Sequence, residues 1–435
     1  MKKIFNSKKT VFGYIAFLHV LTIISILVLA ILAGKDYHDL LLRDDGYYNI
    51  AKGFVNGKPL IYHFVGPGLP FIYSIIHLFP YTLHPFVRLF LSLLTSLGVI
   101  AITFKITEDY LTPKQLFCGG LIFIFNPVYV HFTFKSTPEI FLALLLGIFI
   151  LGILNYYKTK KTRWFIYALL SFAASIFTKP VFLFIPVFLL IASLILKTRN
   201  LIAGSIILIV VSIGLFNIYD NISGGNNNVP KFQRRTYGKA DLIIDSYWNN
   251  YVIKTKQFRK WTITPYKHPD DINKVFNNTE IKNYNIKKDF AFGQYWIKEY
   301  FKKNPNASYL KMNLDFVKDK PGLVAQKLLI SPLFFLGMSA RTIESFVKLF
   351  YSLLAIVLAI MGIRVLLKRN KSFKSYIWII LSCIIGFASL YLVLHSMNRY
   401  SLPILPYLTV WGGIIVNKVP EDIRIIKRKI FANKE

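Results

Sequence analysis

The chain alternates long apolar segments with short basic ones, which is the pattern of a protein that crosses a membrane several times. A membrane-spanning helix needs about 17 to 25 mostly apolar residues, and the first apolar segment, 11–33, meets this requirement. The other segments that we predict to be spans are 86–106, 115–134, 140–157, 164–178, 181–196, 201–219, 345–367, 375–394 and 401–416. The pattern therefore predicts an all-α polytopic membrane protein with about ten transmembrane helices.

Two further apolar segments are too short to span a bilayer comfortably. Segments 67–80 and 328–338 are better explained as interfacial helices that lie along the membrane surface. A longer apolar stretch contains Lys179-Pro180, and proline interrupts a helix, so we expect two short spans that meet there as a hairpin.

Basic residues indicate which side of the membrane each connection occupies. They cluster at 158–163, 197–199, 368–374 and 418–434, and such clusters mark cytoplasmic connections. Both chain termini are then cytoplasmic, and two long polar segments lie outside. The chain divides into an N-terminal membrane module (1–219) with a first outer loop (34–85), an extracytoplasmic domain (220–327) and a C-terminal membrane module (328–435).

Composition excludes an ordinary soluble domain, because 54% of the residues are hydrophobic and only 17% are charged. The net charge of +32 reflects topology and attraction to anionic membrane lipids rather than nucleic-acid binding, since no basic and aromatic motif lies in a soluble cytoplasmic segment. Two cysteines, Cys118 and Cys383, lie in apolar stretches and exclude a disulfide framework. A bias toward Asn, Lys and Ile suggests an AT-rich bacterial genome and location in the plasma (inner) membrane.

Ionisable residues in membrane segments are costly, and here they gather at the predicted outer ends of the spans. A coupled transporter would place charges or broken helices near the bilayer centre, so this distribution predicts chemistry at the outer surface. Basic side chains at span ends can also simply reach for the interface, and Glu139 can either bind a ligand or complement a helix dipole. The residues in question are Arg88, His131, Lys135, Glu139, Lys179, Lys348, His395 and Arg399.

The first outer loop contains two adjacent acidic residues, Asp44 and Asp45, ahead of an amphipathic segment. The backbone donors of a helix start stabilise an ionised carboxylate, but a helix cap needs only one. A second carboxylate against an anionic membrane is not explained by capping. The apolar positions that predict the helix are Tyr47, Ile50, Ala51 and Phe54.

The motif Arg43-Asp44-Asp45-Gly46-Tyr47-Tyr48 after a first membrane helix resembles the acidic motif of the GT-C superfamily of membrane glycosyltransferases. The resemblance is strongest to the branch that contains protein O-mannosyltransferases and lipid A aminoarabinose transferases. Further stretches follow in the order of that family, although segment 220–327 has no match. They are Gly66-Pro67-Gly68, Arg88, Asn126-Pro127 with Pro138-Glu139, Thr178-Lys179-Pro180, and Arg399-Tyr400 ahead of Pro403 and Pro406.

The resemblance implies transfer of a sugar from a polyprenyl-phosphate donor to an acceptor hydroxyl on a protein, lipid or glycan, at the extracytoplasmic face. Asp44 would be the base of an inverting displacement, with cations on the departing phosphate. Some family members carry a charged pair where this chain has Val65-Gly66, so His63, Lys179 or Arg399 would hold the phosphate instead. The predicted substrate-binding residues are Asp45, Glu139, Lys179, Arg399, Tyr400, Arg88, Lys135 and His63.

Other functions remain open at this stage. The same residues could serve a transporter or flippase of lipid-linked sugars, which would move the carrier without cleaving the sugar-phosphate bond. A non-catalytic scaffold would display the basic extracytoplasmic domain to an anionic polymer. No cofactor is required by these residues, although Asp44 and Asp45 could bind a divalent metal.

Overall fold

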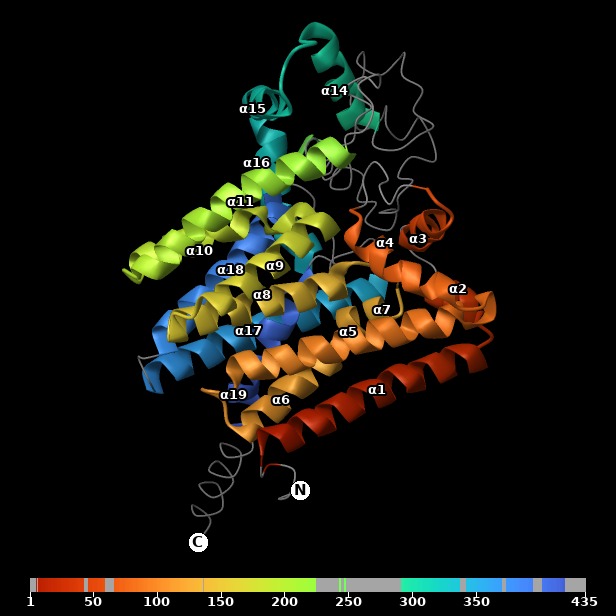
Figure 1. Ribbon diagram of the computed structural model, residues 1–435, viewed down its shortest axis with the longest axis vertical. Coiled ribbons are helices and arrows are strands. Elements are labelled where there is room, and N and C mark those ends of the chain that lie inside the picture. The colour runs from red at the N-terminus through yellow and green to blue at the C-terminus, as the bar shows by residue number, and fades with distance from the viewer. Residues whose placement is uncertain are drawn as a thin grey trace, which may run out of the picture.

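The part of the chain that the structure describes consists of helices and the turns that join them (Figure 1). The structure is a computed structural model, and it describes residues 5, 7–42, 46–58, 66–135, 137–223, 242–243, 246–247, 291–336, 342–369, 373–393 and 401–418. No strand occurs within these ranges. The prediction of an all-α polytopic fold is confirmed.

Six helices within the described ranges are long and apolar enough to cross a membrane, and a bent helix pair makes a seventh candidate. The six include α1 (Lys8–Leu32), α5 (His84–Thr107), α8 (Glu139–Thr159), α11 (Arg199–Ser223), α17 (Thr342–Arg369) and α18 (Lys374–Val393). The bent pair is α6 (Pro113–Ile124) with α7 (Pro127–Thr133). Shorter apolar helices occupy the three remaining predicted spans: α9 (Thr162–Thr178), α10 (Ile185–Ile195) and α19 (Leu405–Val416).

The breaks between these helices follow from local sequence. The side chain of Asn126 accepts hydrogen bonds from the backbone N–H groups of Val128 and Tyr129, and Pro127 occupies the first helical position, so α7 begins anew at 61° to α6. Pro180 likewise ends α9, and a short 3₁₀ helix, η4 (Pro180–Phe184), leads into α10. Proline therefore produces the predicted hairpin.

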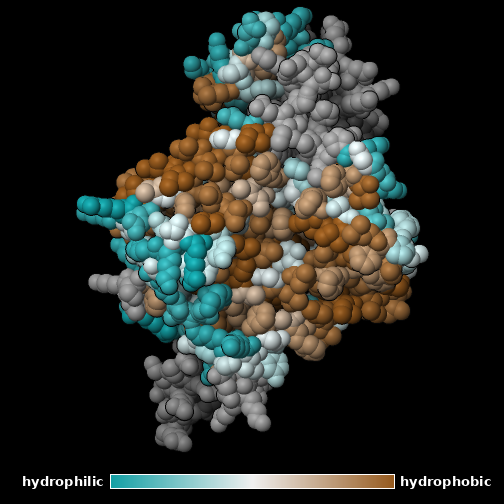
Figure 2. All heavy atoms as spheres, in the orientation of Figure 1, coloured by the Kyte–Doolittle hydropathy of each residue, from teal (hydrophilic) through white to brown (hydrophobic). Residues whose placement is uncertain are grey.

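The centre of the bundle is formed where α19 packs between α6 and α17. A side chain at Gly119 of α6 would lie 2.6 Å from the backbone oxygen of Val410, so only glycine permits this approach. Trp411 and Tyr407 of α19 are fully buried beside it. The outer surface is apolar instead: Leu29 and Leu32 of α1 are 64% and 78% exposed. Figure 2 shows a broad apolar band over the bundle, as expected of a surface that faces lipid.

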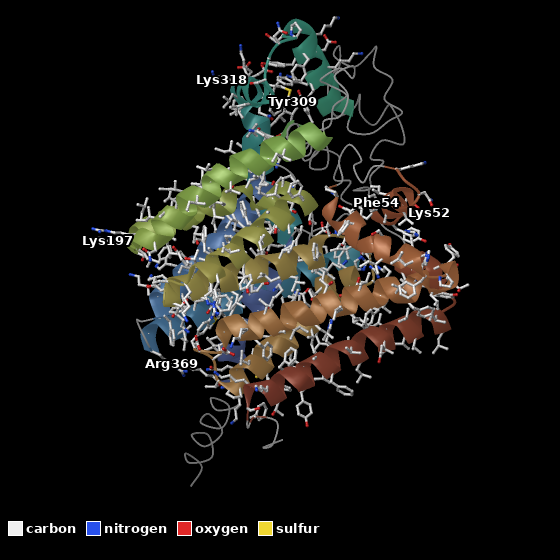
Figure 3. The ribbon with its side chains drawn as sticks, in the orientation of Figure 1. Lys52, Phe54, Lys197, Tyr309, Lys318 and Arg369 are labelled. Atoms are coloured by element: carbon white, nitrogen blue, oxygen red, sulfur yellow. The ribbon has the colours of Figure 1, made fainter. Side chains whose placement is uncertain are left out.

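The two ends of the bundle differ. One end, which we call the loop end, carries the short helices of the first outer loop (Figure 1). They are α2 (Tyr37–Leu42), α3 (Tyr47–Val55), α4 (Gly68–Tyr73), η2 (Ser74–Leu78) and η3 (Tyr81–Leu83). The opposite end, which we call the basic end, carries Lys197 and Arg369, whereas Lys52 and Phe54 lie at the loop end (Figure 3). The predicted sidedness of these ends in the membrane stays a prediction.

The amphipathic helix predicted after the acidic pair is present as α3. Gly46 precedes it with a φ of 97°, a left-handed conformation that favours glycine. Tyr47 and Ala51 are buried in a small cluster with Leu69 of α4, whereas Phe54 is 36% exposed. The cluster fixes α3 against α4.

Three further helices connect the predicted extracytoplasmic segment to the bundle: α14 (Ala291–Lys303), α15 (Tyr309–Asp319) and α16 (Pro321–Leu336). Phe316 and Met312 of α15 are fully buried in a cluster that also contains Ile297 and Val324. α14 and α15 lie beyond the bundle in Figure 1, and α16 joins them to it. Helix α16 runs through the predicted domain boundary at 327/328, and the division into domains stays a prediction.

Candidate active site

A buried ion pair lies at the loop end of the bundle. Lys179 Nζ donates a hydrogen bond to Glu139 Oε1 at 3.1 Å, and the two side chains are only 4% and 0% exposed. The sequence predicted both residues as ligand-binding groups but did not predict that they contact each other. An unpaired buried charge is very costly, so the contact between the two side chains offsets part of the cost of burying them.

Local sequence explains why these two side chains meet. Glu139 is the first residue of α8, where an acidic side chain complements the helix dipole. Lys179 follows the last residue of α9 with an extended backbone, because Pro180 prevents the helix from continuing. α8 and α9 are joined by a tight connection at the basic end, so the start of one helix lies beside the end of the other. The antiparallel pair thus brings residues 139 and 179 together.

Helix α4 covers the break at the end of α9. A Cβ on Gly66 would lie 2.3 Å from the carbonyl oxygen of Phe177, and a Cβ on Gly68 would lie 2.2 Å from Thr178 Oγ1. Neither position has room for a Cβ, because Gly66 packs against the backbone of α9 and Gly68 against the side chain and Cα of Thr178. Two motifs that the sequence placed separately, Gly66-Pro67-Gly68 and Thr178-Lys179-Pro180, are thus in direct contact.

Helix α18 also contacts the Lys179 ammonium. Lys179 Nζ lies 5.2 Å from the ring centre of Tyr391, a buried residue near the end of α18. The next residue, Leu392, accepts a hydrogen bond at 3.3 Å through its carbonyl oxygen from Lys327 Nζ of α16. Lys327 is fully buried and also donates to Ser331 Oγ at 3.3 Å. Two buried lysines therefore approach consecutive residues of α18.

Lys327 and Tyr391 were not among the site residues predicted from the sequence. Lys327 stood at the predicted edge of the extracytoplasmic domain and therefore was not counted among the charges at span ends. A signal was available, because Leu323 and Val324 precede it and Leu328 and Leu329 follow, so its position in α16 is surrounded by apolar residues. Tyr391 gave no signal, because tyrosine is common throughout this chain.

Arg88 and Lys135, which the sequence also predicted to bind substrate, have described contacts with α7 and with a small cavity. Arg88 is fully buried and donates from Nη1 to the carbonyl oxygen of Thr133 at 3.1 Å, at the last residue of α7. This contact satisfies a carbonyl that the helix leaves unpaired and complements its dipole. Lys135 lies 5.5 Å from the ring centre of Phe132 and lines a cavity of about 20 Å³ beside Leu69. That volume suits a single water molecule rather than a sugar.

The remaining predicted site residues lie outside the described part of the chain. They are Asp44, Asp45, His63, Arg399 and Tyr400. Their described neighbours still define the region: Tyr47, two residues beyond Asp45, packs against α4, and α4 covers the end of α9. Tyr47, the first residue of α3, therefore lies at the same end of the bundle as Lys179.

A cluster of histidine and tyrosine side chains supports the first outer loop. His84 Nε2 donates to the carbonyl oxygen of Phe79 at 2.8 Å, which leaves Nδ1 to accept from the Tyr48 hydroxyl at 2.6 Å. His77 Nε2 donates to the carbonyl oxygen of Tyr48 at 3.2 Å. Burial lowers the pKa of His77, and the nearby His84 and Lys52 lower it further, against the opposing effect of the Tyr48 hydrogen bond. His77 is thus held neutral beside α3.

No group of three His, Cys, Asp or Glu residues within the described ranges could hold a metal ion. Cys118 and Cys383 are both free thiols. The described site does offer a buried lysine ammonium that can stabilise negative charge, oriented by a carboxylate and an aromatic ring.

Comparisons with known proteins bear on the segment that holds this site. Residues 65–222 match the sequence model of the family described as dolichyl-phosphate-mannose-protein mannosyltransferase. A search of curated proteins finds no match. Among solved structures, the chain matches the crystal structure of ArnT from Cupriavidus metallidurans bound to undecaprenyl phosphate, with 15% identity, a TM-score of 0.37, and coverage of 92% of this chain and 78% of that one.

The matched segment contains Gly66, Arg88, Glu139 and Lys179, each from a motif on which the sequence resemblance was based. It also contains both members of the buried ion pair and the helix that covers them. Over residues 65–222 the chain is thus similar to a mannosyltransferase family, one of the two groups of enzymes to which its motifs showed a resemblance.

Proposed function

We propose that this protein is a membrane glycosyltransferase that moves a sugar from a polyprenyl-phosphate donor to an acceptor hydroxyl at the loop end of the bundle. The observation that carries the proposal is the buried contact between Lys179 and Glu139, covered by the Gly66–Gly68 turn within the segment that matches the family. The family's described donor is itself a polyprenyl phosphate linked to a sugar.

Position in the membrane favours a lipid-linked donor. The ion pair is buried at the end of a bundle whose sides are apolar, so a donor can reach it while its prenyl chain stays in the bilayer (Figure 2). A lysine at such a place stabilises phosphate more strongly than one in water, because the surrounding dielectric is low. Lys179 is therefore the group that we assign to the donor phosphate.

The proposed reaction is a single displacement. The acceptor oxygen forms a bond to the anomeric carbon, the bond from that carbon to the phosphate oxygen breaks, and its electron pair stays on the phosphate. The acceptor proton passes to Asp44, and Lys179 stabilises the charge that develops on the leaving group. Glu139 would orient Lys179, with which it is paired at 3.1 Å, and would accept a hydrogen bond from a sugar hydroxyl.

Further cations would share the phosphate charge. Arg399 suits the task because a guanidinium donates two parallel hydrogen bonds to a phosphate. Lys327 is a second candidate, since it is buried and approaches α18 one residue from the contact of Lys179. Arg88 is better explained by its contact with the end of α7.

Transfer can be tested with the purified protein in lipid nanodiscs and a radiolabelled polyprenyl-phosphate hexose or pentose. The proposal predicts release of polyprenyl phosphate together with a labelled acceptor, and loss of both in Lys179→Gln. Movement of the carrier across the bilayer without cleavage would instead show a flippase. Mass spectrometry of envelope glycans from a deletion strain would identify the sugar and the acceptor.

A further inference from the structure

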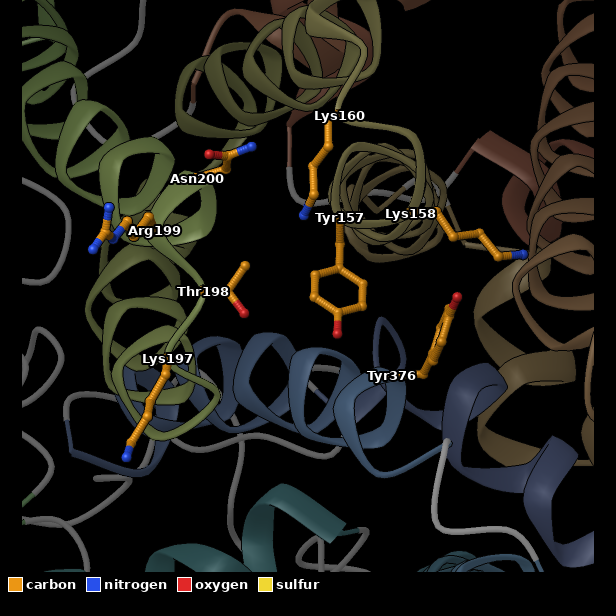
Figure 4. Close-up of a pocket in the computed structure, with 8 residues that line it drawn as sticks. All are labelled: Tyr157, Lys158, Lys160, Lys197, Thr198, Arg199, Asn200 and Tyr376. Atoms are coloured by element: carbon orange, nitrogen blue, oxygen red, sulfur yellow. The ribbon is translucent and has the colours of Figure 1, made fainter.

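A basic groove opens at the end of the bundle opposite the candidate active site. It has a volume of about 580 Å³ and lies between the α8–α9 connection, the α10–α11 connection and the first turn of α18 (Figure 4). Four lining residues are cationic and none is acidic. The lining residues are Tyr157, Lys158, Lys160, Lys197, Thr198, Arg199, Asn200 and Tyr376.

Most of the positive charge in this groove is not neutralised by the protein. Lys158 forms an ion pair with Asp109, which lies beside the groove. In the ranges that the structure describes, no carboxylate forms an ion pair with Lys160, Lys197 or Arg199. Three cations from two different connections thus surround one cavity, which is the electrostatic arrangement of an anion-binding site.

The backbone places two of these lysines where glycine is normally found. Lys160 and Lys197 have φ angles of 57° and 51°, and within the described ranges they are the non-glycine residues with positive φ. Lys160 N–H bonds to the Tyr156 carbonyl, and Lys197 N–H to that of Leu194, so each residue ends a helix in the left-handed conformation. Both lysines thus mark the ends of helices at the edge of the groove, which sets where their side chains begin.

The floor of the groove is aromatic and polar. The rings of Tyr157 and Tyr376 pack edge to face with centres 5.9 Å apart. Lys160 Nζ lies 4.9 Å from the Tyr157 ring centre. In Figure 4 the Lys160 ammonium and the Thr198 hydroxyl face the open space, whereas Lys197 and Arg199 extend outward at the rim. The Thr198 hydroxyl donates to the Leu196 carbonyl at 3.2 Å, so its oxygen lies in the groove as an acceptor while the lysine and arginine side chains supply the donors.

Apolar surface leads directly to the groove. On α10, Ile191, Leu194 and Ile195 are 49%, 55% and 53% exposed, and the last of these is two residues from Lys197. On α11, Ile206 and Ile207 continue the apolar surface at 49% and 48% exposure. Acyl chains can lie along these residues while a phosphate reaches the cations. A soluble phosphate has no acyl chain and would gain nothing from contact with these apolar side chains.

We propose that this groove binds the phosphate headgroup of an anionic phospholipid, whose acyl chains follow α10 and α11. The site is separate from the proposed transferase reaction, since its residues lie at the opposite end of the bundle. The competing explanation is that these residues only fix the orientation of the chain through their charge. That explanation predicts no saturable site and no difference between basic residues inside and outside the groove.

The test compares two triple variants that lose the same charge at the same end of the bundle. The first, Lys160→Asn/Lys197→Asn/Arg199→Gln, removes the groove cations, and asparagine tolerates the left-handed backbone that lysine occupies. The second, Lys368→Gln/Arg369→Gln/Lys374→Gln, changes basic residues that do not line the groove. Each protein is titrated with dioleoyl phosphatidylglycerol or phosphatidylcholine in neutral detergent, and bound lipids are counted by native mass spectrometry.

We expect one saturable phosphatidylglycerol site in the wild type, weaker by about tenfold or more in the groove variant and within about twofold in the control. Equal losses in both variants, or equal binding of the two lipids, would overturn the proposal. Inorganic phosphate is the third probe: if it occupies the site as well as the lipid does, the ligand is a soluble phosphate and the lipid assignment fails. Elution volume in gel filtration checks that both variants are folded.

Discussion

Lys179 at the end of α9 and Glu139 at the start of α8 form a buried ion pair 3.1 Å in length, although 40 residues separate them. The same ammonium lies 5.2 Å from the Tyr391 ring centre, so three helices fix its position. A phosphate that enters this site does not need to order the lysine. Such preorganisation favours stabilisation of a developing charge over mere attraction of an anion.

The ion pair should also stabilise the fold. Glu139→Gln leaves a buried ammonium without its carboxylate, and we expect the free energy of unfolding to fall by about 3 to 5 kcal/mol, as measured by SDS-induced unfolding in mixed micelles. The double variant Glu139→Gln/Lys179→Met should recover most of that loss, because neither position of the pair then carries a buried charge.

A matched control is the exposed pair Lys105–Glu108, whose side chains are 58% and 37% exposed. Lys105→Gln should change the free energy of unfolding by no more than about 1 kcal/mol, since solvent screens exposed pairs. Equal effects of Glu139→Gln and Lys105→Gln would show that burial adds nothing to the contact between Lys179 and Glu139.

Gly66→Ala should displace α4 from the candidate active site although it changes no charged residue. The new methyl group would lie 2.3 Å from the Phe177 carbonyl, so α4 must move away from the break at Lys179. We expect a loss of about 1 to 3 kcal/mol in the free energy of unfolding and a loss of sugar transfer. Gly53→Ala is the control, because its nearest neighbour, Lys58 Cβ, is 3.6 Å away. A wild-type rate of sugar transfer in Gly66→Ala would contradict the close packing of Gly66 against Phe177.

Hydropathy and proline positions were enough to predict the fold. Apolar runs located the helices, and Pro127 and Pro180 located two of their breaks, because these signals are local in the chain. The motif order also selected Glu139 and Lys179. What could not be predicted was their contact, which depends on how α8 and α9 pack and not on either segment alone.

Individual roles were harder to predict than positions. Arg88 was predicted to bind substrate, and that role stays a prediction; the contact that the structure shows is with the end of α7, which no linear pattern reveals. Lys327 was overlooked because the segment before it is polar, so its burial depends on packing between α16 and α18. The roles of Asp44 and Arg399 stay predictions, since both lie outside the described residues.

Asp44→Asn should abolish sugar transfer while membrane insertion and folding persist, because an amide cannot accept the acceptor proton at neutral pH. Transfer is measured as release of polyprenyl phosphate, and folding by gel filtration and thermal unfolding. The control is Asp36→Asn in the same loop, since Asp36 only accepts a hydrogen bond from the His38 backbone at 2.8 Å. Full activity in Asp44→Asn would remove Asp44 from the mechanism.

Donor binding should depend on the cations that face the phosphate. Lys179→Ala and Arg399→Ala should each weaken binding of the lipid-phosphate sugar by about 1.5 to 3 kcal/mol, the range for hydrogen bonds to charged groups. If Lys327 shares the phosphate, Lys327→Met should weaken binding similarly, as measured by equilibrium binding of labelled donor. A loss below about 0.5 kcal/mol in all three would leave them as side chains that only reach the membrane interface.

Acidification should loosen the first outer loop through His77. Its pKa is lowered in the folded protein from an ordinary value of 6.5, mainly by burial, so the unfolded or opened form binds protons more readily. The packing of α3 against η2 is therefore most stable above pH 6.5, and that stability is lost as the pH falls through the lowered pKa.

Hydrogen exchange of residues 47–55, corrected for the intrinsic rate, should rise between pH 7.5 and 5.5 in the wild type. His77→Gln keeps a donor for the Tyr48 carbonyl but cannot titrate, so its corrected exchange should not change with pH, whereas His38→Gln should behave like the wild type. An unchanged pH response in His77→Gln would assign the effect to another group.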